Sequence, residues 1–150
     1  MSLENKINED IKKTMLAREK DKLEALRAIK NAILIAKTEK GAAESLSEEA
    51  EIKILQRMVK QRKESAAIYE EKNRQELAQK ELMEAGVIEQ YLPEQMSKEE
   101  LIAVIKKTIE ETGAKSMADM GKVMGKAQKE LAGKAEGKLI ADTVKSLLSN

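Results

Sequence analysis

The chain has 150 residues, of which 41% are hydrophobic and 37% are charged, and its formal net charge is +1. This length suits one domain or two small ones, and the balanced charge gives no strong overall attraction to nucleic acid or membrane. Cysteine, histidine, tryptophan and phenylalanine are absent, which excludes disulfides, thiolate nucleophiles and histidine general bases. Only two tyrosines are left for stacking on bases.

Apolar residues recur at helical spacings of three and four along the chain, and no stretch shows the alternation of a strand. In the middle of the chain, Leu55, Val59, Arg62 and Ala66 continue one such seam. The pattern predicts an all-α fold. The expected helices lie near residues 3–19, 22–40, 48–71, 74–91, 98–112, 117–132 and 137–148.

Polar residues and glycines mark several of the expected helix ends. Three pairs have the spacing of a capping box: Asp21 with Glu24, Asn73 with Glu76, and Ser97 with Glu100. Gly41 and Gly113 are placed where glycine commonly ends a helix.

Pro93 is the only proline, and we expect it to end the fourth helix and mark a domain boundary. The prediction is an N-terminal bundle of two helical hairpins over residues 1–93 and a small C-terminal three-helix module over residues 94–150. The polar start has no apolar signal core, and the longest apolar run is only Ala32–Ala36. We therefore expect a cytoplasmic protein without a membrane segment.

The C-terminal module contains two glycine pairs at one spacing, Gly121 with Gly125 and Gly133 with Gly137. Glycine inside a helix costs about 1 kcal/mol relative to alanine, so the pairs indicate either close packing or close approach of another molecule. A lysine follows each pair, as in a phosphate loop. The spacing is one residue short, however, no serine or threonine follows, and no strand precedes. We expect no nucleotide, cofactor or metal site.

Lysines of the same module lie on one predicted helix face. Lys122, Lys126 and Lys129 have the spacing i, i+4 and i+7, opposite an apolar stripe that we expect to be buried. That stripe consists of Met117, Met120 and Met124, continued by Ala127 and Leu131. A cationic ridge beside a smooth glycine surface suits a phosphate backbone. A solvated helix face with packing glycines is the simpler interpretation.

Four runs in the C-terminal part are more specific: YLP at 91–93, ETGA at 111–114, SMADMGKVMG at 116–125 and GKAEGKL at 133–139. They resemble the GatB/YqeY domain family, whose free-standing YqeY-like members have about this length. Members often have arginine and aspartate where Lys134 and Glu136 stand, and lysine lacks the bidentate fork of arginine. The stretch 126–132 lacks the proline that we would expect before the turn, which predicts a longer sixth helix.

The resemblance implies that the module is similar to the tail of the B subunit of the tRNA-dependent amidotransferase, which contacts tRNA. A similar module is appended to some glutaminyl-tRNA synthetases. The catalytic centres of the amidotransferase lie in other domains and subunits, so the resemblance implies no catalysis. We expect a non-catalytic tRNA-binding accessory protein with no DNA partner.

Nine residues are the expected RNA contacts. Lys122, Lys126, Lys129, Lys134 and Lys138 would meet phosphates, and Gly121, Gly125, Gly133 and Gly137 would let the backbones approach. One alternative is a protein-docking module that joins an amidotransferase or glutaminyl-tRNA synthetase through its N-terminal bundle. A third possibility, by domain similarity alone, is a carbon–nitrogen ligase with glutamine as amido donor.

Overall fold

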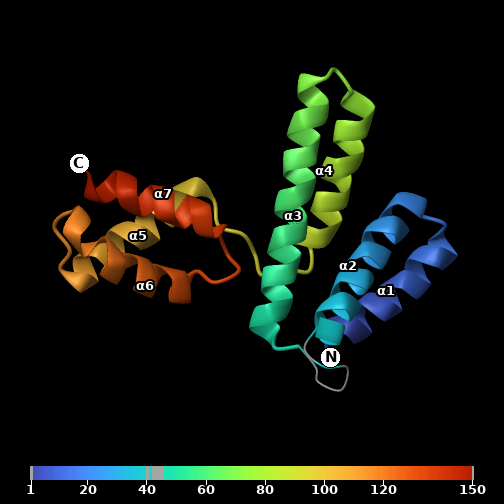
Figure 1. Cartoon of the computed structure of the whole chain (residues 1–150), viewed down its shortest axis with the longest axis horizontal. Helices are drawn as coiled ribbons and strands as arrows, with labels where there is room; N and C mark the ends of the chain where they lie inside the picture. Colours follow the sequence, from blue (N-terminus) through green and yellow to red (C-terminus); the bar gives the residue numbers. More distant parts are fainter. Residues whose placement is uncertain (1, 40, 42–45, 150) are drawn as a thin grey trace. The chain divides into compact units, whose positions relative to one another are not determined.

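The computed structural model describes residues 2–39, 41 and 46–149, and this part of the chain contains α-helices, one short 3₁₀ helix and no strand (Figure 1). The predicted all-α fold class is confirmed. The elements are α1 (Leu3–Ala17), α2 (Lys20–Glu39), α3 (Glu48–Glu71), α4 (Gln75–Glu89), α5 (Lys98–Thr112), η1 (Met117–Asp119), α6 (Met120–Glu130) and α7 (Gly137–Leu148).

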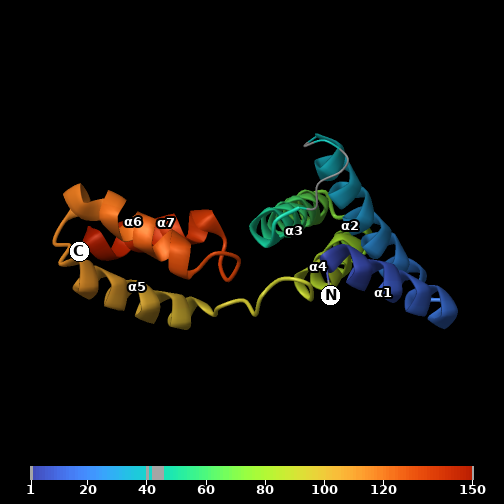
Figure 2. The ribbon, with the colours of Figure 1, turned by 90° about the horizontal axis from the view of Figure 1, so that it is seen from below.

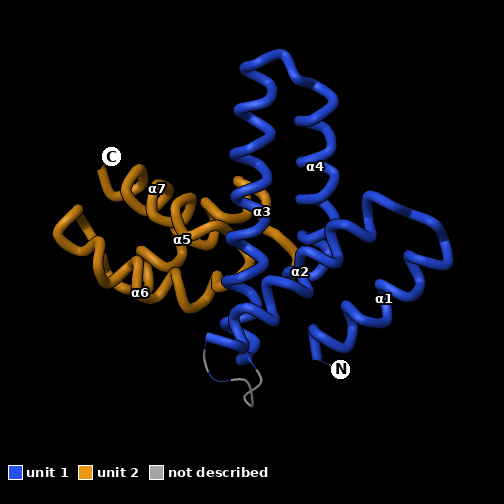
Figure 3. Tube along the Cα trace, turned by 45° about the vertical axis from the view of Figure 1, so that its right-hand side comes forward, with its two compact units in different colours: residues 1–92 blue, residues 93–150 orange. Residues whose placement is uncertain are grey.

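The chain divides into two compact units, Met1–Leu92 and Pro93–Asn150 (Figure 3). Each unit has its own cluster of buried apolar side chains, and the two clusters share no residue.

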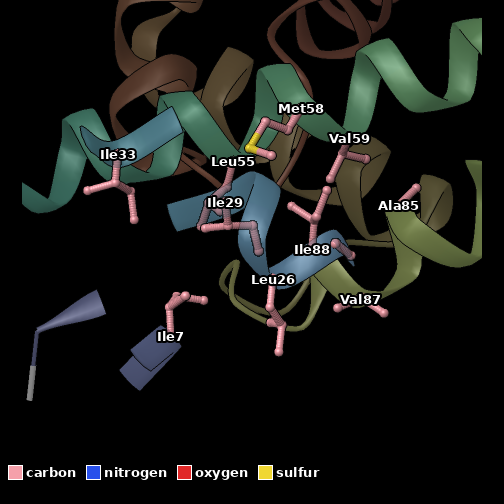
Figure 4. Packing of buried hydrophobic residues seen from close by; sticks show 11 residues of the cluster. Ile7, Leu26, Ile29, Ile33, Leu55, Met58, Val59, Ala85, Val87 and Ile88 are labelled. Atoms are coloured by element: carbon pink, nitrogen blue, oxygen red, sulfur yellow. The ribbon is translucent and has the colours of Figure 1, made fainter. Parts of the chain in front are cut away.

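The first unit consists of two antiparallel hairpins, α1 with α2 and α3 with α4, and α2 packs against both helices of the second hairpin (Figure 1). Leu26 and Ile29 of α2 meet Leu55 of α3 and Ile88 of α4 at the centre of this crossing (Figure 4). All four side chains are at most 1% exposed. Burial of each contributes about 1.5–3 kcal/mol.

Beyond this core, α3 and α4 continue as a two-helix arm. Ala66 and Ala78 are buried in the arm, and such small side chains let two helices pack closely. Arg62, which the sequence places on the same seam, donates from Nε to Glu84 Oε2 at 3.2 Å. Both side chains are largely shielded from water, so the ion pair allows a charge to occupy a seam position.

In the second unit each of α5, α6 and α7 packs against the other two (Figure 2). The core is aliphatic and consists of Leu101, Ile105, Val123, Ala127, Leu131, Ala135, Ile140, Val144 and Leu148. Ser97 Oγ accepts a hydrogen bond from the Glu100 N–H at 3.2 Å, as expected for an N-cap. Gly113 ends α5 in the left-handed conformation, with φ of 71°.

Two of the three predicted capping boxes are wrong. Helix α2 already begins at Lys20, which places Asp21 inside its first turn, where an acid also favours the helix dipole. Asn73 adopts a left-handed conformation with φ of 57°, so Arg74 takes the N-cap position of α4 and makes no side-chain cap. Ser2 and Ser47 cap α1 and α3 instead.

Several helices are shorter than predicted. A left-handed Arg18 ends α1 at Ala17 rather than residue 19, and α4 covers Gln75–Glu89 rather than 74–91. The predicted end of the second helix at residue 40 lies outside the described residues. In the described part of the chain, no helix has the length and apolar character needed to cross a membrane.

Because the two apolar clusters share no residue, we expect the fragments 1–92 and 93–150 to fold separately. Each fragment should give a helical circular dichroism spectrum and a cooperative thermal transition. Its amide NMR spectrum should overlay on that of the full chain, except beside the cut. A fragment that is unfolded alone but ordered in the full chain would show that the units depend on each other.

Candidate nucleic-acid interface

The core of the second unit determines how α6 is rotated. Val123, Ala127 and Leu131 are its buried positions, each at most 1% exposed. The predicted methionine seam is therefore only partly correct. Met120 and Met124 pack against the edge of the same core, while Met117 lies in η1 and is 41% exposed. The 3₁₀ turn interrupts the helical pattern at Met117, and the β-branched Val123 takes the central position.

This rotation places Lys122, Gly125 and Lys129 on the open side of α6, and Gly121 is exposed beside them. We call these four residues the α6 face. Neither lysine forms an ion pair with any residue that the structure describes. Asp119, at the start of the helix, accepts a hydrogen bond from the Lys115 N–H at 3.0 Å. That bond and the nearby lysines hold the pKa of Asp119 below its ordinary value.

Lys126, the middle lysine of the predicted ridge, is already paired. Its Nζ lies 2.5 Å from Glu111 Oε2 at the end of α5, and both side chains are about two-fifths exposed. The hydrogen bond raises the pKa of Lys126 and lowers that of Glu111. Sequence reasoning missed Glu111, because an acid in the run Glu110–Glu111 is indistinguishable from a solvated one until the helices are placed.

Gly121 and Gly125 have no packing role in the described residues. A Cβ atom built at either position would meet no heavy atom within 4 Å, other than its own neighbourhood in the helix. The interpretation that they are packing glycines is therefore wrong. Among the described residues, no close packing at these positions offsets their cost to helix stability.

Gly133 has a different reason to be glycine. It is buried in the turn after α6 with φ of 79°, a conformation that other residues rarely adopt. Gln95 Nε2 donates to the Gly133 carbonyl at 2.6 Å, and the Met96 N–H donates to the Lys134 carbonyl at 2.9 Å. These bonds fasten the turn to the start of the second unit.

The turn also overturns the expectation of a longer sixth helix. The Lys134 N–H donates to the Leu131 carbonyl at 2.9 Å, and α6 ends at Glu130 rather than residue 132. The side chain of Lys134 stays exposed while its backbone holds the turn. The expected proline is absent, but the helix still ends here because the chain enters this hydrogen-bonded turn.

The start of α7 adds a second positive feature. Gly137 is its first residue, and a Cβ there would lie 3.9 Å from Gln128 Nε2, which shows that this end of α7 adjoins α6. Lys138 is exposed in the first turn. Glu136 is the N-cap residue of α7, in an extended backbone conformation.

These features define an all-α protein of two helical units, the second of which exposes a helix face of lysine and glycine. In the part of the chain that is described, no three acidic, histidine or cysteine side chains are grouped to hold a metal ion. The family described as Yqey-like protein matches residues 4–148, and the chain therefore belongs to the YqeY-like family. The resemblance seen in the C-terminal motifs is confirmed and extends over both units. No curated protein matches the sequence.

We expect opposite effects from alanine at the two kinds of glycine. Gly121→Ala and Gly125→Ala should each raise the free energy of unfolding by about 0.5–1 kcal/mol, because the new Cβ meets open space in a helix. Gly133→Ala should lower it by about 1–2 kcal/mol, because its φ is positive. Urea unfolding of the full chain measures both. Destabilisation by Gly121→Ala would contradict an open α6 face.

Proposed function

We propose that this protein is a non-catalytic RNA-binding accessory protein that holds the phosphate backbone of tRNA against the α6 face. The observation that carries the proposal is the α6 face itself, where the open glycines Gly121 and Gly125 alternate with Lys122 and Lys129, two exposed lysines that form no ion pair with the described residues. Glycines that weaken a helix, and whose missing Cβ would meet none of the described atoms outside their own stretch of helix, are explained if a bulky partner approaches the helix backbone there.

Charge supports a phosphate as that partner. Lys122 and Lys129 are two exposed lysines on one face of α6, about two turns apart. Lys138 lies at the start of the adjoining α7. Lysine binds phosphate as a mobile point charge, which gives affinity and position but no sequence readout. Gly133 is left out of the contact set because it is buried.

The choice of tRNA rests on the resemblance of the second unit to the tail of the amidotransferase B subunit. That relationship also favours a cytoplasmic location. Catalysis is not proposed, because neither histidine nor cysteine is present and the glycine pairs lie in helices and a turn rather than in a phosphate loop.

A second candidate function is docking to an amidotransferase or glutaminyl-tRNA synthetase through the first unit. The observation that favours it is the arm of α3 and α4, where Ile68, Leu77 and Leu82 are each at least 40% exposed. Apolar side chains exposed on one projecting element are typical of a protein contact.

We expect tRNA affinity to fall with salt, with a log–log slope of about −2 to −5 for three to five neutralised phosphates. The Lys122→Glu/Lys129→Glu variant should reduce affinity about tenfold or more and flatten the slope by about 1–2. Fluorescence anisotropy of labelled tRNA measures both quantities.

The matched control is Lys106→Glu/Lys145→Glu, two exposed lysines of the same unit that form no ion pair with described residues. Equal losses in the two variants would indicate unspecific charge attraction. Full affinity in the Lys122→Glu/Lys129→Glu variant would remove the α6 face from RNA binding and leave docking as the better candidate.

The ion pair between Glu111 and Lys126 should restrain RNA binding. Glu111→Gln removes the carboxylate that holds Lys126 and that also lies 3.9 Å from the exposed Lys107, so Lys126 becomes available to phosphate. We expect a several-fold gain in tRNA affinity and a slope steeper by just under 1. Glu110→Gln makes the same change of net charge at the neighbouring position and serves as the control. A similar gain from both variants would show that Lys126 itself does not reach the RNA.

A further inference from the structure

The first unit contains a basic pocket that has no part in the proposed RNA contacts. It has a volume of about 230 Å³ and opens between α1, the start of α2 and the end of α4. Lysines from two helices line it: Lys6 and Lys13 of α1, and Lys22 in the first turn of α2. Lys6 and Lys13 are seven residues apart, which places them on one face of their helix.

The carboxylate of Asp10, which lines this pocket, is already hydrogen-bonded within the protein. Tyr91 donates its hydroxyl to Asp10 Oδ2 at 2.5 Å. Burial, together with this hydrogen bond, raises the pKa of Tyr91 well above its ordinary value, so the phenol remains a donor to Asp10. The fixed ring in turn supports Lys6, whose Nζ lies 5.5 Å from the ring centroid.

The remaining groups of the pocket are suited to an anion. Three lysines and one aspartate give the lining a formal charge of 3 − 1 = +2. Outside the lining, Glu19 lies 3.8 Å from Lys22, but both side chains are exposed and such a pair is weak. The amide of Gln90 and the hydroxyl of the buried Thr14 add neutral donors.

We propose that this pocket binds a small phosphorylated compound, with its phosphate group held by Lys6, Lys13 and Lys22. A phosphate monoester carries nearly two negative charges and three acceptor oxygens. A ligand of this kind matches three ammonium groups better than a ligand with a single carboxylate does. Pockets for drug-sized ligands occupy about 300–1,000 Å³, so this smaller volume favours a compact phosphate ester over a ligand of that size.

The composition of the chain provides a probe. Tyr69 and Tyr91 are the only aromatic residues, so the Tyr69→Phe variant leaves Tyr91 as its sole source of tyrosine emission. In that background, inorganic phosphate added at constant ionic strength should change Tyr91 emission in a saturable way, and chloride should not. Amide NMR shifts should concentrate in α1, the start of α2 and residues 90–91. Absence of both responses would overturn the proposal.

Neighbouring lysines give a matched control. Lys13→Gln/Lys22→Gln removes two pocket cations, whereas Lys12→Gln/Lys20→Gln makes the same change at exposed positions of the same helices outside the pocket. The first variant should weaken phosphate binding about tenfold or more, and the second should leave it nearly unchanged. Equal weakening would mean unspecific attraction and would overturn the proposal.

The last test uses tRNA, because the RNA backbone carries the same phosphate group as the proposed ligand. If the pocket binds a small molecule, the Lys13→Gln/Lys22→Gln variant should keep full affinity for tRNA and lose affinity for inorganic phosphate. Loss of tRNA affinity with an unchanged response to inorganic phosphate would assign the pocket to RNA and overturn the proposal. Failure of tRNA to bind the unaltered chain would refute the proposed function and leave this test unaffected.

Discussion

The packing of three side chains determines what the second unit presents to its surroundings. Val123, Ala127 and Leu131 lie at the centre of the core between α5, α6 and α7, and their burial fixes the rotation of α6. Side chains on a helix are 100° apart, so that seam directs Lys122 and Lys129 outward. The same rotation turns Lys126 toward Glu111, where the two charges pair. The exposure of the α6 face is a consequence of how the core packs.

The open glycines of α6 expose its backbone but lower the stability of the helix. An 11-residue α6 with two open glycines is weaker than an alanine-containing helix would be, and the aliphatic core of the unit has to compensate. Natural proteins are rarely at their stability optimum, and stabilising such a helix costs function only where the weak site is used. Gly133 shows the contrast, since its left-handed φ and its bond with Gln95 give it a structural role.

The sequence predicts the helices well because apolar residues at spacings of three and four leave a strong signal. It predicts the exposure of Lys122 and Lys129 for the same reason. It misplaces the α6 seam because Met120, Val123 and Met124 are all apolar, and periodicity alone does not separate seams offset by a fraction of a turn. The pairing of Lys126 with Glu111 depends on how two helices pack, and no local pattern encodes it.

The central claim is that a phosphate backbone approaches the open glycines of α6. The most direct measurement is the tRNA affinity of the Gly121→Ala/Gly125→Ala variant, which adds two methyl groups to the α6 face and changes no charge. The account predicts a several-fold weaker affinity with an unchanged salt slope, because the lysines remain. The fold of the variant should stay intact, so the weaker affinity should not come from unfolding. Unchanged or stronger tRNA binding by this variant would contradict it.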